Sequence, residues 1–205
     1  MFEIALYIPL ASSLMLLNEE TVLDGTKCQL VPYTRDLVEQ YHSWFLSDPT
    51  LLETTGSELL TIEEEYLNQE SWRKDESKLT FLIRDTTLPD HPLCGDINCF
   101  FTEYFREDFE DISEWSEPEY IADGLVGEIN LMIAEKQSRR KGLAEEAVSV
   151  FMHFMRLNIP RIRVILAKIQ ITNIASIALF EKLGFVVHKR VECFGEVHYM
   201  LRLDS

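Results

Sequence analysis

The sequence has few cysteines, and their spacing fits neither of the common structural uses of cysteine. There are four, at Cys28, Cys94, Cys99 and Cys193. No two form a CxxC pair, and none stands at a Cys/His spacing of the zinc type. We therefore expect no metal site and no disulfide framework. Reduced thiols indicate a cytoplasmic protein, and entry into the nucleus is compatible with them.

Basic residues are also scarce, because 19 Lys and Arg stand against 35 Asp and Glu, which gives a formal net charge of -16. Binding of nucleic acid depends on neutralising phosphates, so this balance argues against nucleic acid as the main partner. Two interpretations of the acidic excess stay open. It attracts a basic peptide or an amine, or it only keeps the protein in solution.

The chain lacks an apolar run long enough to span a bilayer, and we expect no membrane association. Its N-terminus, MFEIALYIPLASSLMLL, is apolar, but it has no basic n-region and it carries Glu3. We interpret residues 1–26 as an N-terminal extension, partly disordered or upstream of a start at Met15. A targeting role for this segment is the alternative.

What the sequence does contain is a core and an alternation of strand and helix patterns. Hydrophobic residues make up 46% and aromatic residues 11%, which is ample for one domain at residues 27–205. Helices are expected to begin at Thr34, Thr61, Leu143 and Asn173. Strand patterns are expected at 27–33, 79–84, 94–101, 125–133, 161–167, 185–191 and 196–203. The fold class is therefore α/β or α+β, around a mixed sheet.

Residues 102–123 interrupt this alternation with nine acidic residues, one basic residue and several large apolar ones. We interpret them as an insertion between strands. Either this insertion contacts a protein partner, or its aromatic side chains hold it against its own domain, because large apolar side chains are not left in water without a reason. The apolar side chains are Tyr104, Phe105, Phe109, Ile112, Trp115 and Tyr120.

The stretch QSRRKGLA, at 137–144, places three basic residues before a glycine, between a strand pattern and a helix pattern. A helix that starts there presents unpaired N–H groups and the positive end of its dipole. Gly142 lets the backbone approach an anion without a Cβ in the way, and small Ala144 keeps the first turn open. This arrangement suits a pyrophosphate. Neither GxxxxGK(S/T) nor GxGxxG occurs, which argues against a hydrolysed triphosphate.

Two motifs resemble the signatures of the GCN5-related N-acetyltransferases (GNAT). Arg139-x-x-Gly142-x-Ala144 is similar to the acetyl-CoA signature of that family, and the run from Asn173 to Phe185 resembles its second signature. The two motifs stand in the family's order, and the resemblance covers about residues 27–203. The combination of VPYT, CGDIN, GEINLMIAE and RRKGLAEEAV looks most like the eukaryotic N-acetyltransferase-nine-like branch.

This resemblance implies a GNAT fold, in which a bulged central strand splits a mixed, mostly antiparallel sheet into a V flanked by helices. Acetyl-CoA, as the acetyl donor, lies in the cleft, and the backbone at 131–134 pairs with its pantetheine arm. The implied cofactor-binding residues are Leu131, Met132, Ile133, Arg139, Arg140, Lys141, Gly142, Leu143, Ala144, Asn173, Ser176, Phe180 and Lys182. Two of them have simpler interpretations, because Asn173 suits the N-cap of its helix and Lys182 suits a partner of the helix dipole.

The activity implied by the resemblance is transfer of an acetyl group to an amine by direct attack in a ternary complex. We expect a lysine or N-terminal amine of a protein or peptide, and a small amine such as a polyamine is an alternative. Loss of a proton at pH 7 costs about 4.6 kcal/mol for a lysine and about 1 kcal/mol for an α-amine. A base therefore matters more for a lysine acceptor.

Glu128 is the candidate base, because it lies on the strand of the expected pantetheine contacts, where the family often keeps a glutamate. It acts directly or through a water. The alternatives are that Glu128 is only a surface carboxylate, or that His153 or His198 is the base. A backbone N–H around Met132 is expected to stabilise the oxyanion.

Phe180 departs from the family pattern, in which a tyrosine at this position protonates the departing thiolate. A phenylalanine has no proton to donate. Tyr199 is a substitute donor, and a thiolate also leaves without one and is protonated by water. The departure keeps a second hypothesis open, namely a scaffold that binds acetyl-CoA and catalyses weakly.

Overall fold

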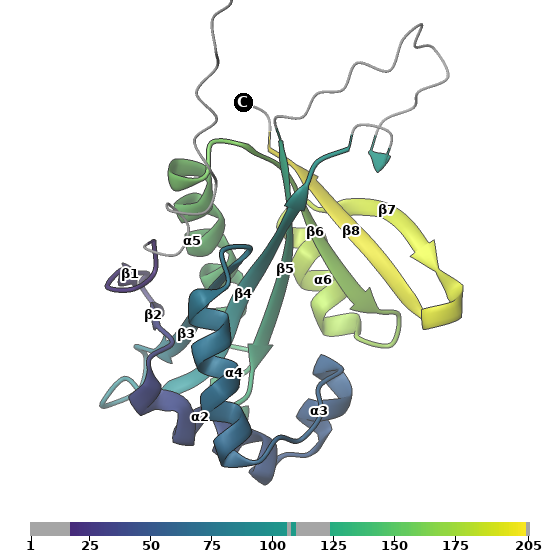
Figure 1. Cartoon of the computed structure of the whole chain (residues 1–205). Helices are drawn as coiled ribbons and strands as arrows, with labels where there is room; N and C mark the ends of the chain where they lie inside the picture. Colours follow the sequence, from purple (N-terminus) through teal and green to yellow (C-terminus); the bar gives the residue numbers. More distant parts are fainter. Residues whose placement is uncertain (1–16, 106–107, 110–123, 204–205) are drawn as a thin grey trace, which may run out of the picture.

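The protein is described by a computed structural model that covers residues 17–105, 108–109 and 124–203 (Figure 1). Within this part of the chain, eight strands form one sheet in the order β1-β2-β3-β4-β5-β6-β8-β7. Neighbouring strands are antiparallel, except that β5 and β6 are parallel. The strands are β1 (Leu23–Asp24), β2 (Cys28–Pro32), β3 (Lys78–Asp85), β4 (Leu93–Glu103), β5 (Leu125–Ile133), β6 (Ile162–Gln170), β7 (Val186–Val191) and β8 (Glu196–Arg202). The expected mixed, mostly antiparallel sheet is confirmed.

Helices cover both faces of this sheet. Side chains of α2 and α3 pack on one face, and side chains of α5 and α6 pack on the opposite face; Figure 1 also shows α4 in front of the sheet beside α2. The α-helices are α2 (Val38–Ser47), α3 (Thr50–Thr55), α4 (Ile62–Lys74), α5 (Leu143–Asn158) and α6 (Ile174–Lys182). The two faces of the sheet are therefore covered by different sets of helices.

The face under α5 holds the larger apolar core. Strand β3 sends Leu79, Phe81 and Ile83 to this face, and all three are fully buried. Phe81 meets Phe151 of α5 edge to face, with ring centroids 5.9 Å apart. Because burying a side chain of this size contributes about 1.5–3 kcal/mol, this packing holds α5 firmly against the sheet.

The opposite face is part polar and part aromatic. Side chains alternate along a strand, so Lys78 and Thr80 of β3 and Asp96 and Asn98 of β4 share this face. All four are buried. The aromatic side chains that pack on this face include Tyr41, Trp44 and Phe45 of α2 and Trp72 of α4. A buried polar row thus lies beside an aromatic wall.

The structure describes part of the N-terminal extension expected before Lys27. Leu23 pairs with Leu30 across β1 and β2, and the side-chain amide of Asn18 donates to the carbonyl oxygen of Thr80 at 2.8 Å. Asn18 and Leu23 thus contact the sheet, whereas residues 1–16 of the expected extension lie outside the described residues. The sequence patterns also do not predict the short helix α3.

The helix starts were predicted with mixed success. Thr61 forms the expected capping box, since its hydroxyl accepts from the N–H of Glu64 and the Glu64 carboxylate accepts from the N–H of Thr61. Thr34, in contrast, makes no side-chain cap and is followed by a 3₁₀ turn before α2. Gly184 follows α6 with φ +87°, as expected for a residue that closes a helix.

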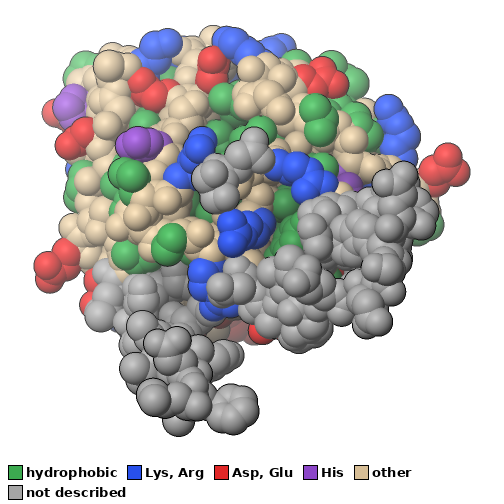
Figure 2. Space-filling model, turned by 90° about the horizontal axis from the view of Figure 1, so that it is seen from above, with side chains coloured by type: hydrophobic (Ala, Val, Ile, Leu, Met, Phe, Trp, Pro, Cys, Tyr) green, Lys and Arg blue, Asp and Glu red, His purple; other side chains and the backbone are tan. Residues whose placement is uncertain are grey.

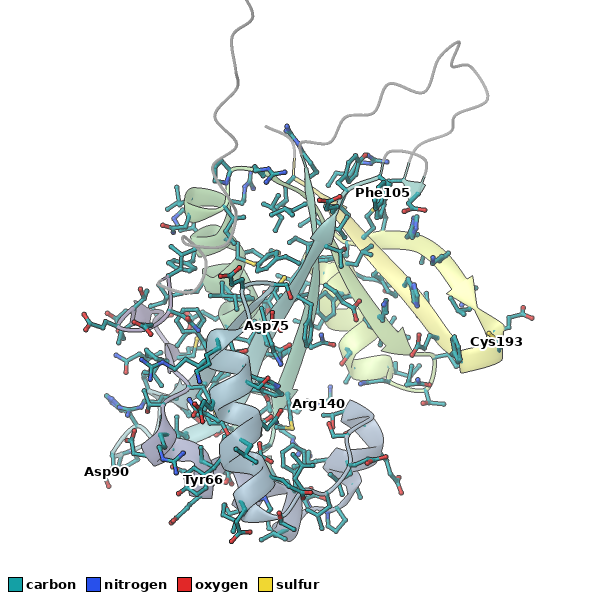
Figure 3. The ribbon with its side chains drawn as sticks, viewed as in Figure 1. Tyr66, Asp75, Asp90, Phe105, Arg140 and Cys193 are labelled. Atoms are coloured by element: carbon teal, nitrogen blue, oxygen red, sulfur yellow. The ribbon has the colours of Figure 1, made fainter. Side chains whose placement is uncertain are left out.

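The described part of the 102–123 insertion is held by its own domain. The N–H of Tyr104 donates to the carbonyl oxygen of Gly124 at 3.0 Å. Phe109 stacks on Tyr104 and on His188 of β7, with centroids 5.3 and 5.4 Å apart. Phe105, labelled in Figure 3, is 42% exposed. Ile112, Trp115 and Tyr120 lie outside the described residues, so a protein contact there stays a prediction.

Two further expectations concern membranes and metals. Within the described ranges, no helix combines the length and the apolarity needed to cross a bilayer. The same residues contain no group of three His, Cys, Asp or Glu side chains that is arranged to hold a metal ion.

Cys193 is exposed and lies at the turn between β7 and β8 (Figure 3). The cytoplasmic location stays a prediction.

The first turn of α5 is clamped to the start of β2 by Glu146. Its carboxylate accepts from the N–H groups of Thr26, Lys27 and Cys28 at 3.0, 2.6 and 2.9 Å, and also from the Thr26 hydroxyl. Partial burial opposes ionisation of this group, but the hydrogen bonds outweigh it and lower the pKa of Glu146 to about 2. The clamp therefore needs the charged form.

Replacing Glu146 by Gln is expected to lower the free energy of unfolding by about 2 kcal/mol at pH 7, since hydrogen bonds to a charged group are lost. Because the folded pKa lies below the unfolded value, this stabilisation is present above about pH 4.5 and disappears as the pH falls towards 2. Urea unfolding at several pH values measures it. Glu145→Gln, which alters only an exposed ion pair, is the control, and equal stability of the two variants at pH 7 would contradict the clamp.

Candidate functional site

The central feature of the sheet is a split between its two parallel strands. β5 and β6 pair only where they begin, from Leu125 to Glu128 on β5, with a register shift between Leu125 and Val126. Beyond Glu128, β5 continues to Ile133 and, within the described chain, pairs on the β4 side alone. Figure 1 shows the two strands diverging. One edge of β5 is therefore open in the middle of the sheet.

The direction of the backbone shows which groups reach this open edge. The N–H of Leu125 donates to the carbonyl oxygen of Arg161, towards β6, so alternate residues of β5 face the same way. The carbonyl oxygen of Met132 faces β4, because a Cβ placed on Gly95 would collide with it. Leu131 and Ile133 therefore turn their N–H groups to the split. The oxyanion donor expected around Met132 would therefore be the N–H of one of these two neighbours, and this role stays a prediction.

A cleft of about 470 Å³ opens at the split. Several residues expected from the sequence line it together, although they come from two elements far apart in the chain, β5 and α6 with its N-cap. They are Glu128, Leu131 and Met132 of β5, Asn173 before α6, and Ser176 and Phe180 of α6. The structure thus joins the strand and the second motif into one site.

The N-terminus of α5 lies at the end of β5 and has the geometry expected of an anion site. Gly142 has φ +86° and Arg140 has φ +63°, which turn the chain sharply into the helix. Among the described residues, nothing accepts a hydrogen bond from the N–H groups of Leu143, Ala144 or Glu145. These N–H groups and the missing Cβ of Gly142 leave a cradle for a diphosphate.

The basic residues before Gly142 divide into different roles. Arg139 donates to the carbonyl oxygens of Ile133 and Ala134, both at 2.8 Å, so it braces the end of β5. Lys141 lies 3.7 Å from the buried carboxylate of Asp85. Arg140, labelled in Figure 3, is exposed. Arg139 and Lys141 are therefore held by protein groups, and neither lines the cleft.

The second motif shows both a capping role and a linking role. Asn173 is the N-cap of α6, since its side-chain oxygen accepts from the N–H of Ser176 at 3.1 Å, and it also lines the cleft. Lys182 forms an ion pair with Glu145 in the first turn of α5 at 2.7 Å. It therefore ties α6 to the anion site and stands near that site, with its ammonium already paired.

The candidate base Glu128 is engaged by a cation. Its carboxylate lies 2.6 Å from the ammonium of Lys168 on β6, and both side chains line the cleft. The pair bridges β5 and β6 where their pairing ends. His153 is exposed on α5, and His198 is buried beside Glu196 at 3.1 Å; neither lines the cleft. Glu128 is thus better placed than either histidine.

Neither Phe180, which has no proton to donate, nor its proposed substitute Tyr199 is suited to protonate the thiolate in this arrangement. Phe180 is buried against Phe185, with centroids 4.9 Å apart. The hydroxyl of Tyr199 donates to Glu181 at 2.8 Å, outside the lining of the cleft. Burial, and then the carboxylate of Glu181, raise the pKa of Tyr199. The expectation that Tyr199 protonates the thiolate finds no support in this geometry.

The inner wall of the cleft carries a buried polar group that the sequence motifs do not indicate. Lys78 is 4% exposed, and its ammonium lies 3.0 Å from the ring centroid of Trp72 and 4.4 Å from that of Phe100. Burial lowers the pKa of Lys78 to about 7, and Asp96 opposes this shift. Asp96 is also 4% exposed, and burial raises its pKa to about 6. The sequence does contain a signal for this group, because Lys78 and Asp96 are charged residues that stand beside apolar ones in the strands β3 and β4.

The surface does not share the acidic excess evenly. Figure 2 shows one end of the molecule, on which several Lys and Arg side chains gather among apolar ones. The lining of the cleft, in contrast, is mainly acidic. Its charged residues are Glu53, Asp96, Glu128 and Glu196, with Lys78 and Lys168. The local charge therefore favours an amine at the cleft more directly than the net charge does.

Comparison with known proteins agrees with this geometry. Residues 28–186 match the family described as Acetyltransferase (GNAT) domain. An N-acetyltransferase 9-like protein of Caenorhabditis briggsae is 40% identical over 199 residues, which cover 93% of this chain and 92% of that protein. The Alpha/beta-tubulin-N-acetyltransferase 9 of Homo sapiens is 36% identical over 202 residues, which cover 93% and 87%.

A solved structure shows the same fold at low sequence identity. It is RimL, a ribosomal L7/L12 alpha-N-protein acetyltransferase in complex with coenzyme A. The TM-score is 0.65 at 13% identity, over 90% of this chain and 99% of that one. At this identity the likeness concerns the fold alone.

Proposed function

Because the chain belongs to the GNAT acetyltransferase family, we propose that it transfers an acetyl group from acetyl-CoA to an amine of a protein. The observation that carries this proposal is the open edge of β5, which ends at the unpaired N–H groups of α5. In acetyl-CoA, the amide-bearing pantetheine arm matches the open edge of β5, and the diphosphate that follows it matches the unpaired N–H groups of α5.

The donor is placed by backbone groups. The pantetheine arm would pair with the open edge of β5 near Leu131 and Ile133, as an added strand does. The diphosphate would lie against the first turn of α5, beside Gly142. Arg139 supports both parts, because it holds the end of β5 next to the turn.

The amine reacts from the opposite, acidic side of the cleft. Its nitrogen attacks the thioester carbonyl carbon, and the oxyanion accepts a hydrogen bond from the N–H of Leu131 or Ile133. The carbon–sulfur bond then breaks, and coenzyme A leaves as a thiolate that takes its proton from water. Glu128 receives the proton of the amine, directly or through a water, at the cleft end of its ion pair with Lys168.

The acceptor is chosen from the names of the relatives. A human relative is named for α- and β-tubulin, and RimL is named for a protein α-amine. We therefore take tubulin as the first acceptor to test. Deprotonation of an α-amine at pH 7 costs less free energy than deprotonation of a lysine, so the reaction of an α-amine depends less on Glu128 as a base.

Incubation of the protein with isotope-labelled acetyl-CoA and tubulin, or with peptides of the tubulin N-termini, is expected to place one label on an amine. Mass spectrometry of the fragments locates it. Glu128→Gln is expected to lower turnover about 100-fold, because a general base contributes roughly 100-fold to 10,000-fold, while acetyl-CoA affinity stays unchanged. Glu103→Gln, on the exposed end of β4, is the matched control.

If acetyl-CoA binds but no tested protein, peptide or polyamine receives label, the scaffold hypothesis replaces the enzyme. If label is transferred and Glu128→Gln leaves both turnover and the pH–rate profile unchanged, Glu128 is not the base.

Replacing Gly142 by Val is expected to weaken acetyl-CoA binding at least about 10-fold, since a side chain would fill the diphosphate cradle and strain a left-handed residue. Gly184→Val is the matched control, because that glycine has nearly the same φ and has no atom within 4 Å of the added Cβ. Calorimetry compares the two. Normal binding by the Gly142 variant would contradict the diphosphate site.

A further inference from the structure

A buried lysine on the inner wall of the cleft has no hydrogen-bonding partner within the described part of the chain. The ammonium of Lys78 rests on the rings of Trp72 and Phe100, and no described residue accepts a hydrogen bond from it or forms an ion pair with it. The ammonium is not completely enclosed by protein, and Lys78 lines the cleft. A cation in this setting is stabilised when an oxygen atom of a ligand approaches it.

A buried carboxylate on the same wall is also incompletely used. The Oδ2 atom of Asp96 accepts from the side-chain amide of Asn98 at 3.0 Å, and the described residues offer no donor to its Oδ1. Oδ1 is likewise not fully enclosed. Asp96 stands directly opposite Met132 across β4 and β5, next to the residues whose N–H groups face the split. Its free oxygen therefore lies close to the place of reaction.

The lysine and the aspartate do not satisfy one another. They influence each other's charge, but their polar atoms are too far apart for an ion pair. Lys78 is opposite Phe100 and Asp96 is opposite Leu82, so the two positions are separated along the strands. The cleft thus offers a free acceptor near the split and a free donor farther along the same wall.

We propose that Asp96 and Lys78 bind the first residue of the acceptor chain. The N–H of its α-amine donates to Oδ1 of Asp96, and the carbonyl oxygen of the same residue accepts from the ammonium of Lys78. An N-terminal residue carries this donor and this acceptor on either side of one Cα atom. This inference rests on the proposed acetyltransferase function and names the residues that recognise its acceptor.

The pair also explains how a terminal residue is distinguished from a lysine side chain. A lysine ε-amine has only methylene groups next to it, so binding it would leave the Lys78 ammonium without an acceptor. Leaving a buried charged group unpaired costs more than the bond itself contributes. Tyr41, Phe45 and Trp72, which also line the cleft, supply the apolar wall for the rest of the residue.

The test uses two forms of the tubulin peptide that the wild-type protein acetylates. One is the normal peptide, and the other has an (E)-alkene in place of its first peptide bond, which removes the carbonyl oxygen without adding charge. Lys78→Met is expected to lower kcat/KM for the normal peptide about 10-fold or more, and to leave kcat/KM for the alkene peptide unchanged. Asp96→Asn is expected to lower both, because both peptides present the amine.

Lys74→Met is the matched control, since Lys74 is exposed on α4 and, among the residues that the structure describes, forms an ion pair with Glu70 alone. Acetyl-CoA affinity, measured by calorimetry, is expected to be the same in all variants. An equal loss with both peptides in Lys78→Met would mean a structural role and overturn the proposal. So would full activity of that variant, or label on a lysine side chain. Transfer by the wild type to no amine would instead overturn the acetyltransferase function, and this inference with it.

Discussion

The structure depends on one interrupted pairing, the separation of β5 from β6 after Glu128. Backbone N–H and C=O groups in the interior of a sheet are normally paired, and an unpaired edge in the middle of a domain carries a cost in free energy. Here the cost is confined to a few residues that end at Ile133. An extended ligand that supplies the missing bonds would remove it, so the same feature that weakens the sheet creates the site.

Three contacts fasten the elements that surround this split. Arg139 holds the carbonyl oxygens at the end of β5, Glu146 fastens the first turn of α5 to β2, and Lys182 ties the end of α6 to α5. Each contact is made by a charged side chain, which binds either backbone groups or an oppositely charged side chain. Contacts that fix these elements in the free protein reduce the entropy that a ligand would lose on binding between them.

The sequence predicts the fold well where local patterns decide it. The capping box at Thr61, the glycine turn at Gly142 and the order of strands and helices follow from spacing alone, and the match to the GNAT family confirms the resemblance that two motifs indicated. The pairing of the short strand β1 with β2 was not predicted, because it is not set by a local pattern. The burial of Lys78 and Asp96 beside the cleft depends on contacts between segments far apart in the chain. Arg139 shows the same limit, because its motif position indicates a ligand while its guanidinium binds backbone.

Residue-resolved amide hydrogen exchange, with and without acetyl-CoA, tests the open edge most directly. The amides of Leu131 and Ile133 are expected to exchange fast in the free protein and to become protected when acetyl-CoA binds, together with the first turn of α5. The amide of Met132, which faces β4, is protected in both states. Binding of acetyl-CoA that leaves exchange at Leu131 and Ile133 unchanged would contradict pairing of the ligand with the open edge of β5.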